Sequence, residues 1–146
     1  MTSWLNGEWI KAGEAGIGTT DRGLLLGDGL FETLRYSGGR VLRLAAHEQR
    51  LRASCEALDL DCPLDGGALG PIIAELTDRA GLERAAIRLT LSAGSGERGL
   101  ARSTSSQPAC LITAAPLARP PAALTLASRS VRRSRSSYAT RNKTLR

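Results

Sequence analysis

The chain has 146 residues, of which 42% are hydrophobic and 23% are charged, as is typical of a globular domain with one core. It contains no apolar run of about 18 residues and no segment with the layout of a signal peptide, so we expect a cytoplasmic protein without a membrane anchor. The net charge of +6 arises in residues 121–146, which hold seven basic and no acidic side chains, while the rest carries a net charge of −1. The body of the protein therefore lacks the basic surface of a nucleic-acid-binding domain.

The first part of the sequence predicts two hairpins. Asn6-Gly7 lies between apolar residues and favours a type I′ turn that joins two short strands. A strand is predicted over 30–36, followed by a tight turn at Gly38-Gly39 and a return strand over 40–44.

Helical periodicity follows. Apolar residues recur at helical spacing from Leu44 to Leu58 and predict a helix over 45–58. A second helix is predicted over 67–80, with Gly81 as its stop.

The remaining segments predict two strands, over 86–92 and 109–115, separated by a Gly- and Ser-rich loop. Hairpins, then helices, then strands predict an α+β domain over residues 1–118. Residues 119–146 are predicted to be an interdomain linker and the beginning of a second domain. In this part we expect a strand over 124–128 and an Arg- and Ser-rich loop over 129–141.

The three cysteines, Cys55, Cys62 and Cys110, form no CxxC pair and are odd in number. This pattern does not suit a metal site or a disulfide framework, so we expect no bound metal and interpret all three as small buried hydrophobic residues.

The most informative residues lie in five short motifs. DRG at 21–23, GDGLFET at 27–33 and HEQRL at 47–51 are followed by GSGERG at 94–99 and NKTL at 142–145. Three glycines within 23–29 indicate special backbone angles or close approach of another group, and simple turns would explain them equally well.

In this order and spacing, the motifs resemble the class IV (fold type IV) family of pyridoxal-phosphate enzymes. That family includes 4-amino-4-deoxychorismate lyase, D-amino-acid aminotransferase and branched-chain aminotransferase. The resemblance covers essentially the whole chain, although members of the family are considerably longer. It implies the N-terminal domain of a D-amino-acid-aminotransferase-like fold and pyridoxal 5′-phosphate as the cofactor.

The resemblance assigns two residues to the cofactor. Lys143 would bond covalently to the cofactor aldehyde and then move a proton at the substrate carbon, which requires an amine rather than a guanidinium. Only Lys11 and Lys143 are lysines, whereas 18 residues are arginines. Arg50 would grip the cofactor phosphate, because its planar fork suits two phosphate oxygens. Without the resemblance, Lys143 and Arg50 would be ordinary surface cations.

Two further residues are candidates for substrate contact. Phe31 would form an apolar wall near the cofactor, or would simply pack in the core. Arg98 would hold a substrate carboxylate, or would shape its loop. His47 is interpreted as a structural neighbour of Arg50 rather than a general base. Asp21 and Asp28, which adjoin turn residues, are interpreted as turn formers and helix caps.

The leading functional hypothesis is a lyase that converts 4-amino-4-deoxychorismate to 4-aminobenzoate and pyruvate in folate synthesis. The alternative is an aminotransferase for D- or branched-chain amino acids. Phe31 and Leu100 weaken the D-amino-acid alternative, because that branch tends to carry tyrosine and histidine there. A non-enzymatic domain whose basic tail binds nucleic acid is the third hypothesis, but Tyr138 is the only aromatic residue of the tail.

The acidic residue that pairs with the cofactor ring nitrogen in this family would follow the lysine and has no counterpart in the 146 residues. We therefore expect this polypeptide to be inactive alone. The resemblance also implies a homodimer that acts on a small-molecule substrate, with no nucleic-acid or membrane partner.

Overall fold

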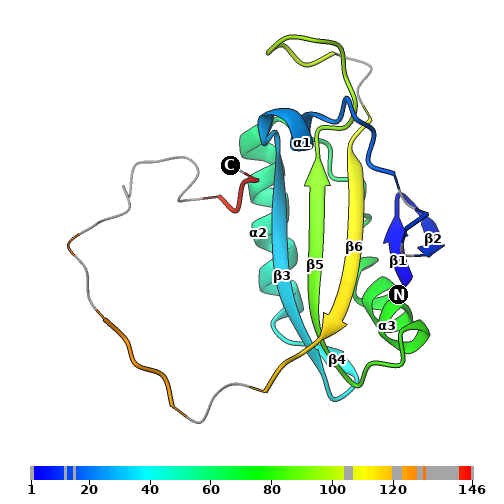
Figure 1. Cartoon of the computed structure of the whole chain (residues 1–146), viewed down its shortest axis with the longest axis vertical. Helices are drawn as coiled ribbons and strands as arrows, with labels where there is room; N and C mark the ends of the chain where they lie inside the picture. The colour runs from blue at the N-terminus through cyan, green and yellow to red at the C-terminus, as the bar shows by residue number, and fades with distance from the viewer. Residues whose placement is uncertain are drawn as a thin grey trace.

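The computed structural model describes residues 2–11, 13–14, 16–103, 107–119, 123–127, 130 and 142–145. Its centre is a six-stranded sheet in the order β2-β1-β6-β5-β3-β4, in which every paired strand is antiparallel (Figure 1). The strands are β1 (Thr2–Leu5), β2 (Glu8–Lys11), β3 (Gly29–Ser37), β4 (Arg40–Val41), β5 (Arg84–Ser92) and β6 (Ala109–Pro116). The helices are α1 (Arg22–Leu26), α2 (Leu44–Leu58) and α3 (Leu69–Arg79). This arrangement confirms the predicted α+β class.

Two tight turns fix the hairpins. Asn6 and Gly7 have φ angles of 48° and 98°, both in the left-handed region that a type I′ turn requires. Gly38 and Gly39 have φ angles of 62° and 73° and join β3 to β4. Both predicted turns are confirmed.

The sheet has one covered face and one open face. α2 packs against β3, and α3 packs against β1 and β6, on the same face of the sheet (Figure 1). Alternate residues of the strands point to these helices and form the core, among them Leu30, Leu34, Ile87, Leu89, Leu91, Cys110 and Ile112. The intervening residues, such as Phe31, Arg88 and Thr90, face away from the core and are partly or fully exposed.

Three expectations about the elements need correction. The return strand predicted over 40–44 is only Arg40–Val41, because Arg43 adopts a left-handed φ of 55° and Leu44 begins α2. α1 was not predicted, since five residues are too few for a periodic pattern. The strand predicted over 124–128 is absent from its described part, residues 124–127. Most of the predicted loop over 129–141 lies outside the described residues.

The cysteines match their interpretation in part. Cys55 and Cys110 are buried among core residues, whereas Cys62 is only partly buried. Within the part of the chain that the structure describes, no helix is long and apolar enough to cross a membrane.

Candidate active site

Residues 142–145 pair with the free edge of β3 through an isolated antiparallel bridge. Thr144 forms an antiparallel bridge with Leu30, Phe31 N donates to Lys143 O at 2.7 Å, and Leu145 N donates to Gly29 O at 3.0 Å. The side chain of Ser54, on α2, donates to Asn142 Oδ1 at 3.1 Å. The lysine predicted to carry the cofactor is therefore held against β3, although more than 100 residues separate the two in sequence.

Gly29 allows residues 142–145 to lie this close to β3. A Cβ atom at this position would collide with the carbonyl oxygen of Leu91 and would lie 2.7 Å from Cδ1 of Leu145. The second glycine of the GDG motif thus allows β5 on one side and the lysine segment on the other to approach the backbone of β3 closely.

Lys143, Phe31 and Arg88 form a group on the open face of the sheet. Nζ of Lys143 lies 5.3 Å from the centroid of the Phe31 ring, and Cζ of Arg88 lies 4.3 Å from it. Arg88 Nε also donates to Thr90 Oγ1 at 3.3 Å. Two cations therefore flank one aromatic ring, an arrangement stabilised by cation–π attraction.

The sequence motifs did not identify Arg88 as a site residue, although the alternation of apolar residues around it indicates which face of the sheet it lies on. The inward alternation of Ile87 and Leu89 places the residue between them on the opposite face. Register pairs Thr90 with Phe31 across the two strands, so that Arg88 is a diagonal neighbour of that ring.

Arg50 lies on α2 and is bonded to Glu32. Its Nε donates to Oε1 of Glu32 at 2.6 Å and its Nη2 donates to Oε2 at 2.5 Å, a bidentate pair. Nδ1 of His47 lies 2.7 Å from Oε2 of the same carboxylate. His47 thus neighbours Arg50, in agreement with a structural interpretation. Glu32, whose role the sequence did not reveal, fixes the orientation of Arg50.

Glu32 and Arg50 each stabilise the charged form of the other. Glu32 is 1% exposed, and burial acts to raise its pKa, but the hydrogen bonds from Arg50 and His47 hold the pKa below its ordinary value. The hydrogen bond to Glu32 in turn raises the pKa of Arg50. Glu32 is ionised and Arg50 is protonated at neutral pH, so Arg50 presents a fixed positive charge.

The donors present fit pyridoxal phosphate. Nη1 of Arg50 has no hydrogen-bond partner among the described residues, and 43% of that side chain is exposed. Oγ1 of Thr144, next to Lys143, is a buried hydroxyl without a partner in the described part of the chain. An amine for an aldehyde, and a guanidinium and a hydroxyl for a phosphate, are the groups that this cofactor requires.

Arg98 lies elsewhere. It is exposed, in the loop that follows Gly94, and has no hydrogen bond or ion pair with a described residue. The described residues thus bring Lys143 to Phe31 and Arg50 to the adjacent Glu32, but they do not bring Arg98 to this group.

The two aspartates of the glycine-rich segment differ. Asp21 caps α1, as expected, since Oδ1 accepts from Leu24 N at 3.1 Å. Asp28 takes part in the turn that ends α1, since its backbone N donates to Arg22 O at 3.2 Å, but the sequence did not predict that its buried carboxylate pairs with Arg22 and Arg102. Arg102 is distant in sequence, and no local pattern connects it to Asp28.

These features define the N-terminal domain of a fold type IV enzyme, and the comparisons agree. The family model described as amino-transferase class IV matches residues 29–146, and the chain belongs to this family. Members of the family use pyridoxal 5′-phosphate as their cofactor.

Individual relatives have different activities. The chain is 34% identical over 117 residues to a putative branched-chain-amino-acid aminotransferase of Methanocaldococcus jannaschii, covering 80% of this chain and 41% of that protein. It is 30% identical over 95 residues to the D-alanine aminotransferase of Staphylococcus aureus (strain N315), covering 65% of this chain and 34% of that protein. The chain thus spans less than half the length of these relatives.

Among solved structures, 4-amino-4-deoxychorismate lyase from Pseudomonas aeruginosa is similar, with a TM-score of 0.65 and 29% identity. The match covers 82% of this chain and 41% of the lyase chain. Both branches of the family, lyase and aminotransferase, are therefore among the similar proteins.

Proposed function

We propose that this chain is part of a pyridoxal-phosphate lyase that converts 4-amino-4-deoxychorismate to 4-aminobenzoate and pyruvate. The observation that carries the proposal is the position of Lys143. Its backbone pairs with β3, and its amine lies 5.3 Å from the Phe31 ring centroid. Arg50, fixed by Glu32, supplies a positive charge for the phosphate.

Each residue has a distinct role in this proposal. When bound, pyridoxal phosphate supplies an electron-accepting ring that stabilises the charge left when a substrate carbon loses a proton. The amine of Lys143 takes and returns that proton, since an amine can exchange protons near neutral pH and a guanidinium cannot. Arg50 binds the phosphate, and Phe31 provides an apolar wall that excludes water. Arg88 and Arg98 offer guanidinium groups to the substrate carboxylates.

Two residues favour the lyase within the family. Phe31 replaces the tyrosine expected in the D-amino-acid branch, and Leu100 replaces its histidine. The side chain of Leu100 is 84% exposed and cannot bind a carboxylate. The alternative, an aminotransferase for D- or branched-chain amino acids, is favoured by the two relatives whose names give those activities.

We further propose a domain boundary near residue 118 and a homodimer located in the cytoplasm. The end of β6 at Pro116 supports the boundary. Leu24 and Leu25, 67% and 62% exposed on α1, support association, because exposed apolar side chains mark contact surfaces.

The cofactor assignment is tested by titrating the protein with pyridoxal phosphate and recording its visible absorbance. We expect a new band from the lysine-bound cofactor in the wild type and in Lys11→Ala, the matched control at the other lysine. The band should be absent in Lys143→Ala. A band that persists in Lys143→Ala would contradict the assignment.

A second measurement, made on the full-length enzyme because this chain is expected to be inactive alone, separates lyase from aminotransferase. Release of pyruvate from 4-amino-4-deoxychorismate without an amino acceptor is the result expected of the lyase. Turnover that depends on 2-oxoglutarate would instead identify an aminotransferase.

A further inference from the structure

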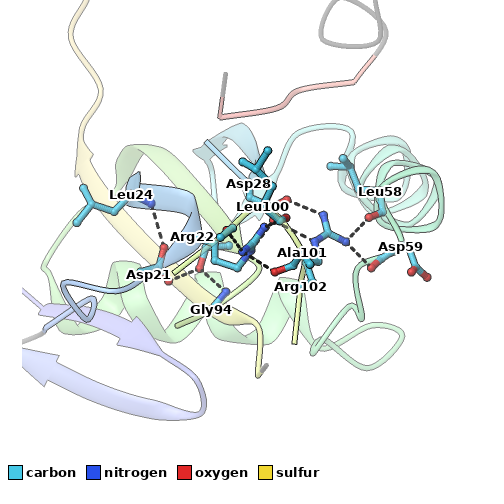
Figure 2. Close-up of polar contacts among 12 residues, drawn as sticks. Asp21, Arg22, Leu24, Asp28, Leu58, Asp59, Gly94, Leu100, Ala101 and Arg102 are labelled. Carbon is cyan, nitrogen blue, oxygen red and sulfur yellow. Dashed lines mark hydrogen bonds and ion pairs between the residues drawn. The ribbon is translucent and has the colours of Figure 1, made fainter. Parts of the chain in front are cut away.

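The carboxylate of Asp28, which lies between α1 and β3 and is 7% exposed, binds two arginines from different parts of the chain. Arg22 Nε donates to Oδ2 at 2.9 Å, while Arg102 donates from Nε to Oδ2 at 3.0 Å and from Nη2 to Oδ1 at 2.5 Å (Figure 2). The hydrogen bonds of Arg102, followed by those of Arg22, lower the pKa of Asp28 although burial opposes them. The carboxylate is therefore ionised at neutral pH. We call Arg22, Asp28 and Arg102 the Asp28 cluster.

Both arginines also bind backbone carbonyls. Arg22 donates to three consecutive carbonyl oxygens, those of Gly99 (3.2 Å), Leu100 (2.7 Å) and Ala101 (3.1 Å). A loop whose carbonyls converge on one buried guanidinium has little freedom at those three residues.

Arg102 connects the same loop to the C-terminal end of α2. Its Nη1 donates to the carbonyl oxygens of Leu58 (2.5 Å) and Asp59 (2.8 Å), as Figure 2 shows. Carbonyls at a helix C-terminus lack intrahelical partners and carry the negative end of the helix dipole, so a cation is favourable there. The cluster thus anchors the loop to the helix that carries Arg50.

The beginning of the loop is fixed independently. Gly94 O accepts from Arg22 N at 2.9 Å, and Gly96 N donates to Thr20 O at 3.2 Å. Only Glu97 and Arg98 lie between this anchor and the three carbonyls held by Arg22. The anchors therefore determine where Arg98 emerges from the loop.

We propose that the Asp28 cluster positions the loop 94–102 so that Arg98 is held ready to bind a carboxylate of the substrate. Arg22, Asp28 and Arg102 are positioning residues, because they act through the loop and do not contact substrate themselves. The proposal rests on the proposed function in one respect, the role of Arg98 as a carboxylate contact.

The test compares Asp28→Asn with the wild type in the full-length enzyme to which this chain is proposed to belong, loaded with pyridoxal phosphate. Loss of one negative charge removes the ion pairs of Asp28 with Arg22 and Arg102 and loosens the loop. We expect KM for the carboxylate-bearing substrate to rise about tenfold, as for a lost charge-assisted hydrogen bond, with kcat and the cofactor absorbance little changed. Glu75→Gln, which removes an exposed carboxylate paired with Arg79 on α3, is the matched control and should change neither value.

Limited trypsin digestion supplies a readout that needs no activity. We expect faster cleavage after Arg98 in Asp28→Asn than in the wild type or Glu75→Gln, measured by mass spectrometry of the fragments. Arg102→Lys is a milder variant, which keeps a positive charge near Asp28 but loses the planar guanidinium that binds Asp28 through Nε and Nη2 and the carbonyls of Leu58 and Asp59 through Nη1. It should give an intermediate cleavage rate and an intermediate KM.

The outcomes separate this proposal from the proposed function. Unchanged cleavage after Arg98 in both variants would overturn the proposal, and so would faster cleavage with an unchanged KM, since the cluster would then be structural only. Absence of a cofactor band in the wild type would instead refute the proposed function, while the digestion would still report on the cluster.

Discussion

Glu32 and Asp28 each bind an arginine, but Arg50 and Arg22 differ in whether a guanidinium nitrogen remains available for a ligand. Arg50 places Nε and Nη2 on Glu32 and keeps Nη1 available at a half-exposed position. Arg22 places its nitrogens on Asp28 and on backbone carbonyls and is 5% exposed. Among 18 arginines, composition cannot separate these roles. The hydrogen-bond partners of each arginine determine its role, and most of those partners are remote in sequence.

Gly29 gives a prediction at the same scale. Gly29→Ala should destabilise the protein by about 1–3 kcal/mol and weaken cofactor binding, because the added Cβ meets Leu91 and displaces Leu145. Thermal unfolding and titration with pyridoxal phosphate measure the two effects. Gly16→Ala is the control, since no atom lies within 4 Å of a Cβ at that position. Unaltered cofactor affinity in Gly29→Ala would show that the lysine segment is not seated through Gly29.

The cysteines provide a second prediction for single residues. The hydrogen bond with Cys55 lowers the pKa of Cys62 to about 6, assisted by the backbone of Leu64 and the charge of Arg52 and opposed by burial. Burial raises the pKa of Cys110 to about 12. Because the thiolate is the nucleophile and the pKa of Cys62 is lowered, iodoacetamide should alkylate Cys62 before Cys110 near neutral pH.

Peptide mapping after brief alkylation of the native protein identifies the modified cysteine. Cys62→Ser should abolish the fast phase. Rapid labelling of Cys110 in the native protein would contradict the assignment.

At the level of elements, local patterns predicted most of the secondary structure. Period-2 alternation identified β5, an apolar run identified β6, and helical spacing identified α2 and α3 within two residues at each end. The failures have physical causes. Arg43 enters the left-handed region without a glycine, which ended β4 early. α1 is a single capped turn, too short for periodicity.

The candidate site was predicted less completely than the elements. Lys143, Arg50 and Phe31 came from motifs, while the bond from Glu32 to Arg50 joins residues 18 positions apart and the bond from Asp28 to Arg102 joins residues 74 apart. Such pairings depend on tertiary structure, which one sequence does not reveal. The alternation of apolar residues in β5 predicts that Arg88 lies on the face opposite the core. Only the register between β5 and β3 shows that Arg88 is a neighbour of Phe31.

At the level of the whole molecule, two buried carboxylates connect the site to stability against acid. Asp28 and Glu32 both have pKa values below their ordinary values of 3.8 and 4.5. The unfolded chain therefore binds protons at a higher pH than the folded protein, so their contribution to stability is present above the ordinary pKa values and is lost as the pH falls through the folded ones.

We therefore expect the free energy of unfolding to decrease on acidification below about pH 5. Asp28→Asn and Glu32→Gln should each be less stable than the wild type at neutral pH and show a weaker decrease. Urea unfolding at a series of pH values measures this, with Glu75→Gln as the exposed control. A variant that keeps the full pH dependence would exclude its carboxylate as the source.

The pairing of residues 142–145 with β3 has a consequence beyond the proposed cofactor site. β4 covers only the far end of β3, and the amide of Phe31 and the carbonyl of Gly29 would face solvent without the lysine segment. An unpaired strand edge next to apolar residues is a template on which another chain can add a strand and begin to aggregate. The same backbone hydrogen bonds that bring the amine of Lys143 to Phe31 therefore also cover this part of the edge and protect it from pairing with another chain.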